Sequence, residues 1–275
     1  MKKIKDHFLT KETFELEYDL RHKMYRTVPK PPETMMGSYY KKDDYFSHKS
    51  RPATLFEKFF FFFKKVMLAK KLKIIKKLFS KPLTSLDVGS GTGDFVLTLA
   101  MSGWESFGVE PFVSARIKAE KKGVKHLSSM FEAKDGEFDL VTFWHSFEHV
   151  YSLNDTIEQV NRILKHDGIL LIACPNFNSW DAKYYKEFWA GWDVPRHLRH
   201  FSLTSLKTVL EPKGYKQIDV KSLLLDGYYV SMLSEKIKGS RFYFIKGFLC
   251  GFVSNFLASF NKNYSSSIYI FKKQK

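Results

Sequence analysis

The stretch LDVGSGTGDF, residues 86–95, decides the fold predicted for this chain. Its apolar start predicts a strand that ends near Asp87, and its last residues open a helix at Asp94. Three glycines alternate through the turn between them: Gly89, Gly91 and Gly93. Glycine lets the backbone approach a ligand without a Cβ clash and allows positive φ. The stretch therefore predicts a ligand-binding loop between a strand and a helix.

The spacing of these glycines indicates which ligand the loop binds. A dinucleotide fingerprint has its third glycine where this chain has Asp94, so the loop suits a pyrophosphate poorly. A carboxylate at Asp94 suits the ammonium group of a methionine moiety, or a water network, better. Glu110 lies at the end of the next predicted strand, where its carboxylate can accept hydrogen bonds from both hydroxyls of a ribose.

The rest of the chain alternates strand and helix patterns around this loop. Strands are predicted over residues 83–88, 105–110, 124–128, 138–144, 169–174, 215–222 and 267–273. Helices are predicted over residues 93–102, 112–122, 153–165 and 203–213. This alternation predicts an α/β fold with a doubly wound, mostly parallel seven-stranded sheet. Ligands of such sheets bind at the carboxyl ends of the strands.

Three segments fall outside this repeat. Residues 1–80 are a predicted N-terminal arm, irregular over 1–50 and followed by a basic amphipathic helix from Leu55 to Phe79 that acts as a cap. Residues 81–275 form the predicted core. Within it, residues 175–201 are a predicted lid and residues 223–266 a predicted helical insertion. We expect these insertions to cover the active site.

Composition narrows the class of protein and its surroundings. With 275 residues, 44% of them hydrophobic, the chain suits one α/β core with additions. Its net charge of +16 attracts phosphates, but charge alone does not choose among nucleic acid, lipid headgroups and a phosphorylated substrate. The two cysteines have no metal-ligand spacing, and no signal peptide is recognised, so we expect a cytoplasmic protein.

The glycine-rich loop and the acidic residue after it resemble those of the class I S-adenosylmethionine-dependent methyltransferases, in a bacterial branch related to the small-molecule, ubiquinone-type O-methyltransferases. Besides the glycine-rich loop, the resemblance covers FDLVTFWHSFEHV, IEQVNRILKHDG, ILLIACPN and WDVPRHLRHFSLTSLKTVL. It implies a Rossmann-like fold, S-adenosylmethionine as methyl donor and S-adenosylhomocysteine as product. It also implies the cofactor-binding residues, namely Asp87, Gly89, Ser90, Gly91 and Gly93 around the methionine and ribose, Glu110 on the ribose, Ser128 or Ser129 near the adenine, and Trp144 beside the cofactor.

The segment HSFEH at 145–149 supplies the candidate catalytic residues His145, Glu148 and His149. Its His-x-x-Glu-His spacing is that of a zinc hydrolase, but such a site needs a helix and this segment follows a predicted strand. It also resembles a Glu-x-x-Glu-His metal site of ubiquinone-type O-methyltransferases, with His145 in place of the first glutamate. We therefore expect no metal. A histidine near its free pKa suits removal of an acceptor's proton; a hydrogen-bond network at a helix start is the alternative.

The predicted lid supplies candidate substrate-binding residues: Trp189, Trp192, Arg196, His197 and His200. Aromatic walls with a few polar groups suit an organic acceptor. The alternative is an aromatic core that packs the segment. Arg196 either holds an acidic substrate or pairs with Asp193.

Two apolar runs, FFFFFKK at 59–65 and RFYFIKGFLCGFVSNFLASF at 241–260, stand out. Arg241, Lys246 and Asn255 interrupt the second, so we expect no transmembrane helix. A hydrophobic cap over the substrate pocket is expected instead. The alternative is a basic, Phe-rich surface that rests on a membrane or receives a lipid-linked substrate.

The function predicted from these observations is transfer of a methyl group from S-adenosylmethionine to an acceptor, with oxygen as the expected atom, of a small or lipid-linked metabolite. Nucleic-acid methylation is one alternative, although the chain has no Asn-Pro-Pro-Tyr-like segment and no Pro-Cys nucleophile after the fourth strand. A cofactor-binding or scaffold protein without catalysis is the other. The sequence leaves the oligomeric state open.

Overall fold

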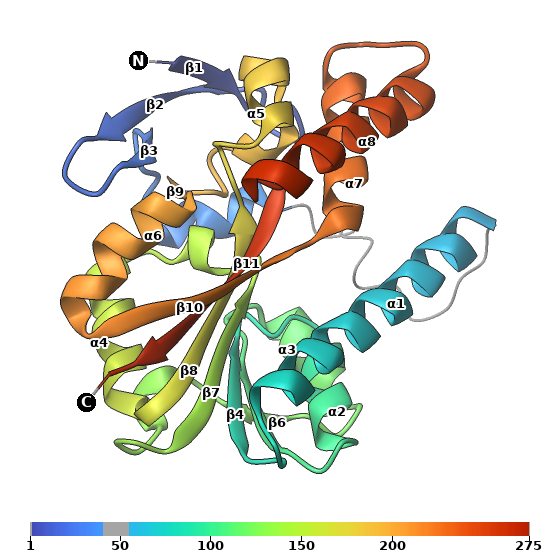
Figure 1. Ribbon diagram of the computed structural model, residues 1–275. Coiled ribbons are helices and arrows are strands. Elements are labelled where there is room, and N and C mark those ends of the chain that lie inside the picture. The colour runs from blue at the N-terminus through green and yellow to red at the C-terminus, as the bar shows by residue number, and fades with distance from the viewer. Residues whose placement is uncertain (1, 41–54, 275) are drawn as a thin grey trace. The chain divides into compact units, whose positions relative to one another are not determined.

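The computed structural model describes residues 2–40 and 55–274 (Figure 1). Its strands are β1 Lys2–Lys5, β2 Thr13–Asp19, β3 Met24–Val28, β4 Thr84–Val88, β5 Glu105–Val109, β6 Lys125–Leu127, β7 Phe138–Trp144, β8 Leu164–Pro175, β9 Arg199–His200, β10 Tyr215–Ser222 and β11 Ser266–Lys273. Its α-helices are α1 Leu55–Leu78, α2 Asp94–Ala100, α3 Val113–Glu120, α4 Leu153–Ile163, α5 Trp180–Tyr185, α6 Leu203–Leu210, α7 Leu224–Ile237 and α8 Tyr243–Asn261.

Seven strands form one sheet in the order β10-β11-β8-β7-β4-β5-β6. Strand β4 pairs in parallel with β5 and with β7, and β5 pairs in parallel with β6. At the other end of the order, β10 and β11 pair antiparallel. The predicted α/β fold with a mostly parallel seven-stranded sheet is confirmed.

Strand β7 shows why these segments pair. Leu140, Val141 and Phe143 are fully buried in it. Strands buried on both faces read as continuous apolar runs, which is the pattern of parallel sheets covered by helices. The bounds predicted for β7 and β10 agree with the structure, whereas β8 begins before the Asp167-Gly168 pair, ahead of its predicted start at residue 169.

The chain divides into two compact units, which we describe separately. The first comprises Met1–Lys41, His145–Ile157 and Leu171–Lys275, and the second comprises Lys42–Trp144 and Glu158–Leu170. We call them the acceptor unit and the cofactor unit, after the residues that the sequence predicted for each. Helix α1, in the cofactor unit, confirms the predicted helix; its FFFFF run lies outside the described side chains.

The irregular arm predicted over residues 1–50 is wrong for the described residues 2–40. Strands β1, β2 and β3 pair antiparallel in sequence order, and β9 completes a second, four-stranded sheet in the acceptor unit. In β2, Phe14 and Leu16 are buried and alternate with Glu15 and Glu17. This alternation is the signature of a half-buried strand.

The segment 223–266 is helical, as predicted, and its helices α7 and α8 pack side by side (Figure 1). Small residues make this contact on α8: the buried Gly247, Gly251, Ser254 and Ala258. A Cβ atom at Gly251 would lie 2.7 Å from the Cα of Tyr228, so the helix backbones approach too closely for a side chain there. Helix α8 is also long and apolar enough to cross a membrane by length and composition, with only 22% of its apolar window buried.

The close contact predicts that Gly251→Val destabilises the protein. Overpacking a contact of this kind costs about 1–3 kcal/mol, and we expect the free energy of unfolding measured with urea to fall by that amount. Phe252→Val is the matched control, because Phe252 is 55% exposed on the same helix and the substitution introduces the same β-branch. Equal stability of the two variants would show that α7 and α8 do not pack through this face.

Candidate active site

The glycine-rich loop runs from the end of β4 to the start of α2 in the cofactor unit. The backbone N–H groups of Gly89 and Ser90 donate to the carbonyl of Val109, at 2.8 and 3.1 Å, which ties the loop to the end of β5. Gly93 has φ of 73°, and a Cβ atom there would lie 2.4 Å from Val124 Cγ2. Gly91 has φ of 56°, and a Cβ atom there would meet nothing within 4 Å. Gly93 is therefore required by packing, whereas Gly91 borders open space.

Glu110 holds the two loops together. Its carboxylate accepts from the backbone N–H of Gly91 at 2.7 Å and from that of Phe112 at 2.8 Å. Burial raises the pKa of Glu110, although both backbone N–H groups oppose that shift. A carboxylate has about four lone-pair sites, so each oxygen keeps capacity for a further donor. The ribose contact of Glu110 stays a prediction that this geometry permits.

Asp87 is a buried carboxylate at the end of β4. Only 5% of its surface is exposed, and Thr142 Oγ1 donates to it at 2.7 Å. Burial raises the pKa of Asp87 to about 6, in spite of the Thr142 bond and the positive charge of Lys71. Asp87 is therefore ionised at neutral pH, but less favourably than in water, and a bound cation would stabilise its charge.

Two of the other predicted cofactor residues, Ser90 and Asp94, lie in the glycine-rich loop and at the start of α2. Asp94 does not offer a free carboxylate, since Lys122 Nζ lies 3.0 Å from it and Thr92 donates to it at 2.6 Å. Ser90 Oγ lies 3.2 Å from His126 Nε2.

Two further predicted residues follow β6, and a third ends β7. Ser128 is exposed and bonded to Glu132, and Ser129 follows it at the start of a short 3-10 helix, Met130–Glu132. Trp144 is buried against Phe95, and Lys71 Nζ lies 4.1 Å from its ring centroid. All the predicted cofactor residues therefore belong to the cofactor unit, around the carboxyl ends of β4, β5, β6 and β7.

His145 follows Trp144 directly in the chain and belongs to the acceptor unit. Its φ of 55° lies in the left-handed region, which is uncommon for a residue other than glycine and often marks a functional site. Its Nε2 lies 2.9 Å from Asp226 of α7, and its Nδ1 lies 3.5 Å from Glu148. Burial lowers its pKa, but these two carboxylates outweigh burial and raise the pKa to about 10. His145 is therefore protonated at neutral pH, unlike the free-pKa base that the sequence suggested.

Glu148 and His149 are the last two residues of the HSFEH segment and lie in a short 3-10 helix, Phe147–His149. Glu148 is 1% exposed; burial raises its pKa, but His145, His197 and His149 prevail and lower it to about 2. Burial and the neighbouring His197 lower the pKa of His149 to about 4. Glu148 is thus ionised and His149 neutral at neutral pH, so both can accept a hydrogen bond or a cation. Their lowered pKa values make them weaker bases than the histidine near its free pKa that the sequence predicted.

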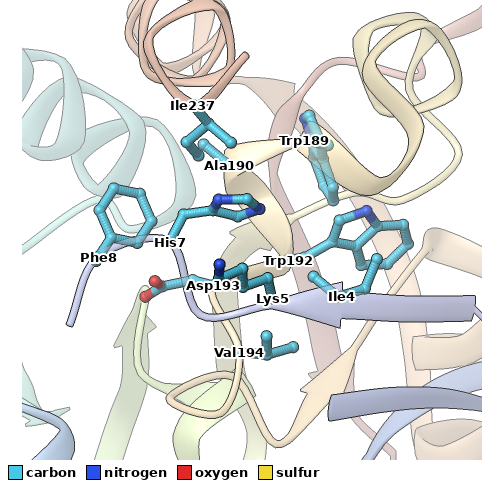
Figure 2. Close-up of a pocket in the computed structure, with 10 residues that line it drawn as sticks. All are labelled: Ile4, Lys5, His7, Phe8, Trp189, Ala190, Trp192, Asp193, Val194 and Ile237. Atoms are coloured by element: carbon cyan, nitrogen blue, oxygen red, sulfur yellow. The ribbon is translucent and has the colours of Figure 1, made fainter. Parts of the chain in front are cut away.

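The aromatic residues of the predicted lid form a core. Trp189 and Trp192 are each 2% exposed and pack with Ile4, Phe14 and Leu16 of the N-terminal strands. A hollow beside them measures about 190 Å³ with its open mouth (Figure 2). Small-molecule sites typically have about 300–1,000 Å³. Both tryptophans therefore pack in an aromatic core, which is the alternative that the sequence left open. Their contact with a substrate stays a prediction.

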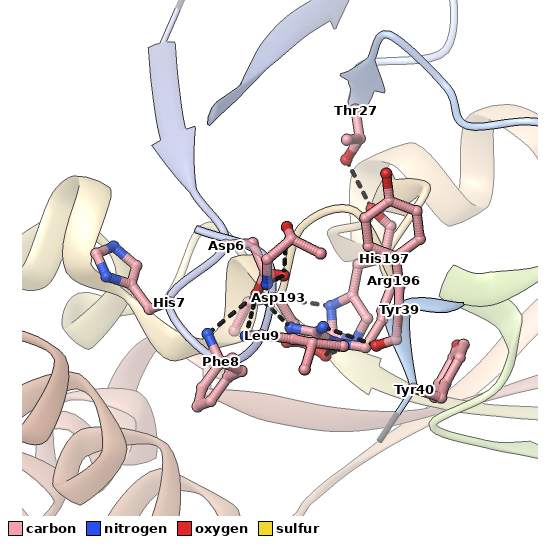
Figure 3. A network of polar contacts seen from close by, with 12 residues as sticks. Asp6, His7, Phe8, Leu9, Thr27, Tyr39, Tyr40, Asp193, Arg196 and His197 are labelled. Carbon is pink, nitrogen blue, oxygen red and sulfur yellow. Dashed lines mark hydrogen bonds and ion pairs between the residues drawn. The ribbon is translucent and has the colours of Figure 1, made fainter. Parts of the chain in front are cut away.

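Arg196 is bound by carboxylates of its own chain (Figure 3). Its NH2 lies 2.6 Å from Asp193 and 3.0 Å from Asp6, and its NH1 donates to the carbonyl of Tyr39. Burial lowers the pKa of Arg196, but Asp193 and Asp6 outweigh burial and raise the pKa above its usual value, so the charge of Arg196 is permanent. The sequence alternative in which Arg196 pairs with Asp193 matches this arrangement. His200 is likewise held inside, 3.1 Å from Thr27 Oγ1.

The comparisons with known proteins agree with this geometry. A family model described as a methyltransferase domain matches residues 60–220, more than half of the chain. The chain belongs to the methyltransferase-domain family. The C-methyltransferase NovU of Streptomyces niveus is 24% identical over 156 residues, which make up 52% of this chain and 35% of that protein. The chain thus spans about a third of the length of this curated relative.

Solved structures show the same fold. A SAM-dependent methyltransferase from Archaeoglobus fulgidus has a TM-score of 0.52 at 22% identity, covering 76% of this chain and 94% of that one. Phosphoethanolamine N-methyltransferase 2 of Haemonchus contortus, in complex with S-adenosyl-L-methionine, has a TM-score of 0.52 at 17% identity, covering 75% and 53%. The predicted family, fold class and cofactor are confirmed, whereas the ubiquinone-type O-methyltransferase branch is not.

The residues of the cofactor unit fit S-adenosylmethionine. The space beside Gly91 is open, so a ligand can approach the backbone of the loop there. The raised pKa of Asp87 is consistent with a ligand that carries a positive charge. When bound, S-adenosylmethionine supplies a methyl group already activated by its sulfonium charge. Sequence reasoning missed Lys71 and Asp226, which lie far along the chain from the residues that they contact and have no motif around them.

The raised pKa of Asp87 predicts the pH dependence of an Asp87→Asn variant. A carboxyl whose pKa is about 6 when folded and 3.8 otherwise stabilises the fold below pH 3.8 and loses that contribution as the pH rises through 6. The introduced amide does not titrate, and its oxygen can still accept from Thr142. We expect the variant to be more stable than the wild type by about 1–3 kcal/mol near pH 8, and by little near pH 4, in urea unfolding without cofactor.

Asp139→Asn is the control of opposite sign. Burial raises the pKa of Asp139, but Lys165 and Thr84 outweigh burial and lower it, so its removal should destabilise the protein near neutral pH. A wild type as stable as Asp87→Asn at alkaline pH would show that Asp87 carries no burial penalty.

Proposed function

We propose that this protein transfers the methyl group of S-adenosylmethionine to an oxygen of a small or lipid-linked metabolite. The observation that carries methyl transfer is the link between Glu110 and the glycine-rich loop, because it sets the backbone of Gly91 beside an acidic side chain. A family match over residues 60–220 supports the same activity. The acceptor is proposed on the chemistry of the residues that follow Trp144.

An oxygen acceptor is proposed because the acceptor unit holds proton acceptors directly after the cofactor unit's Trp144. A hydroxyl must lose its proton when it is methylated, and a positioned carboxylate or imidazole performs this task. Glu148 is ionised and His149 neutral at neutral pH. The protonated His145 can donate to an acceptor oxygen and orient it. These residues mainly have to align the acceptor oxygen with the methyl group, because the sulfonium of S-adenosylmethionine already activates that group.

A lipid-linked acceptor is proposed because of the outward face of α8. Its large side chains are about half exposed: Phe244, Ile245, Phe248, Leu249, Phe252, Phe256 and Phe260. Residues 236–275 carry lysines and one arginine but no Asp or Glu. Apolar side chains combined with basic charge bind the surface of an anionic bilayer. Strand β11, which follows α8, is buried in the sheet, so we propose that α8 lies on the membrane rather than across it.

The free thiols of Cys174 and Cys250 accord with a cytoplasmic location, which completes the proposal. The membrane surface would then be the cytoplasmic leaflet.

The link through Glu110 predicts that Glu110→Ala weakens S-adenosylhomocysteine binding. The substitution removes the proposed ribose contact and frees the Gly91 loop; loss of one hydrogen bond to a charged acceptor costs about 1.5–3 kcal/mol, so the dissociation constant should rise at least about tenfold in calorimetry. Glu105→Ala is the control, since Glu105 is exposed at the start of β5, the strand that precedes Glu110. Wild-type affinity in Glu110→Ala, or a preference of the wild-type protein for NAD, would contradict the proposed cofactor site.

The acceptor is tested with labelled S-adenosylmethionine and cell extract, followed by mass analysis of the product. Label on an oxygen of a small or lipid-soluble product supports the proposal. Label in RNA or DNA would replace it with nucleic-acid methylation. Tight S-adenosylhomocysteine binding with no labelled product from any fraction would favour a non-catalytic role.

The exposed face of α8 predicts binding to anionic vesicles. In flotation with phosphatidylglycerol–phosphatidylcholine vesicles, Phe248→Ser combined with Phe252→Ser should weaken binding about tenfold or more, because each phenylalanine buries apolar surface in the bilayer interface. Phe131→Ser is the control, since Phe131 is 69% exposed outside this region. Failure of the wild-type protein to float, or equal flotation of all variants, would remove the membrane from the proposal.

A further inference from the structure

Three side chains of the acceptor unit converge although they come from two separate segments. Glu148 and His149 belong to the 3-10 helix Phe147–His149, and His197 precedes β9. One ligand atom from each of the three lies within 4.8 Å of the others. Glu148 and His197 also line one small cavity. The cofactor loop uses none of the three.

The two imidazoles are held so that one nitrogen of each keeps a lone pair. His149 Nδ1 lies 2.8 Å from the carbonyl oxygen of Arg196. His197 Nδ1 lies 3.0 Å from the carbonyl oxygen of Gly191; Arg196 and His197 can be found in Figure 3. A carbonyl oxygen can only accept, so each Nδ1 carries the hydrogen. In the neutral imidazoles Nε2 is then unprotonated. Histidines that bind metal almost always donate their other N–H in this way, which fixes the ring and raises its basicity.

The carboxylate of Glu148 is buried beside imidazoles but accepts no hydrogen bond from the described residues. It is 1% exposed, and neither oxygen has a hydrogen bond within the described residues 2–40 and 55–274. The nearest imidazole nitrogens are His145 Nδ1 at 3.5 Å and His197 Nε2 at 4.0 Å. A buried carboxylate without hydrogen bonds is costly unless a cation compensates it. Asp193 adds a further anion 3.8 Å from His197 Nε2, although Arg196 binds it.

We propose that Glu148, His149 and His197 bind a divalent transition-metal ion. Two imidazoles and one carboxylate form a ligand set that zinc and similar ions accept. Magnesium prefers an oxygen-rich octahedron and is disfavoured here. Metal–ligand distances of about 2.0–2.2 Å would draw the three side chains together by roughly 1 Å. Three protein ligands leave a tetrahedral ion one position for water or an acceptor oxygen. The ion would then replace Glu148 and His149 as the group that promotes proton loss, because a metal lowers the pKa of an oxygen bound to it.

This inference departs from the absence of metal that the sequence predicted. The expectation rested on His145 as a replacement for a glutamate in one short stretch. In the structure His145 pairs with Asp226, and the third ligand comes instead from His197, a residue of the predicted lid. The ion would join the 3-10 helix to the segment before β9.

The test is zinc binding to the full-length protein after removal of metal with a chelator. Calorimetry should show one high-affinity Zn²⁺ per chain, and the dialysed protein should retain one equivalent by elemental analysis. His197→Ala and Glu148→Gln should each weaken Zn²⁺ at least about thirtyfold, as expected for loss of one of three ligands. The control is His166→Ala, whose histidine is exposed outside the cluster and should leave binding unchanged.

Circular dichroism and S-adenosylhomocysteine calorimetry on the same samples separate loss of the metal site from loss of the fold or of the proposed function. Absence of tight Zn²⁺ in folded wild-type protein would overturn the proposal. So would unchanged Zn²⁺ affinity in both folded cluster variants, or a preference for Mg²⁺ over Zn²⁺.

Discussion

The parallel pairing of β4 with β5 and β7 is the constraint on which the cofactor site depends. The register sets Val88 opposite Val109 and Asp87 opposite both Gly108 and Thr142. Because the strand ends lie level, Glu110 reaches the backbone of Gly91 one strand away, and Thr142 reaches the carboxylate of Asp87. A slip of either pair by one residue would turn these side chains to the other face of the sheet. The glycine-rich loop alone would not assemble the site.

Buried charges in this protein differ in whether the chain itself compensates them. Arg196 is compensated fully: Asp6, Asp193 and a backbone carbonyl surround it, so it joins the N-terminal strands to the segment before β9. Asp87 and Glu148 are not compensated in the same way. The pKa of Asp87 is raised by burial, and Glu148 has charged neighbours but no hydrogen bond among the described residues. Removing one partner of a paired buried charge is strongly destabilising, whereas an incompletely paired buried charge is a candidate position for a cationic ligand.

The sequence predicted the elements that depend on interactions between residues close together in the chain. Strand β7 and the loop after β4 were found because apolar runs and glycine spacing act over a few residues. The N-terminal strands were missed although Phe14 and Leu16 alternate with glutamates, because alternation over so few residues is a weak signal in a polar segment. The contacts of His145 with Asp226 and of His149 with His197 had no sequence signal, because they join segments far apart in the chain. For the same reason the sequence identified the cofactor but not the environment of its candidate bases.

Helix α8 shows a further limit of periodicity, because a helical period defines two faces without saying which one is buried. Ordinary amphipathic helices bury their large apolar side chains. Here the contact with α7 needs close backbones, and only glycine, serine and alanine fit between them. Phe252, Phe256 and Phe260 lie outside this contact and remain exposed, whereas Phe248 stacks on Tyr228 of α7 and is half exposed. Helices that pack through small residues and direct large apolar side chains outward are typical of proteins in contact with lipid rather than with water. The packing of the helix pair, rather than its hydrophobicity, is thus the physical reason to expect a lipid surface against this face.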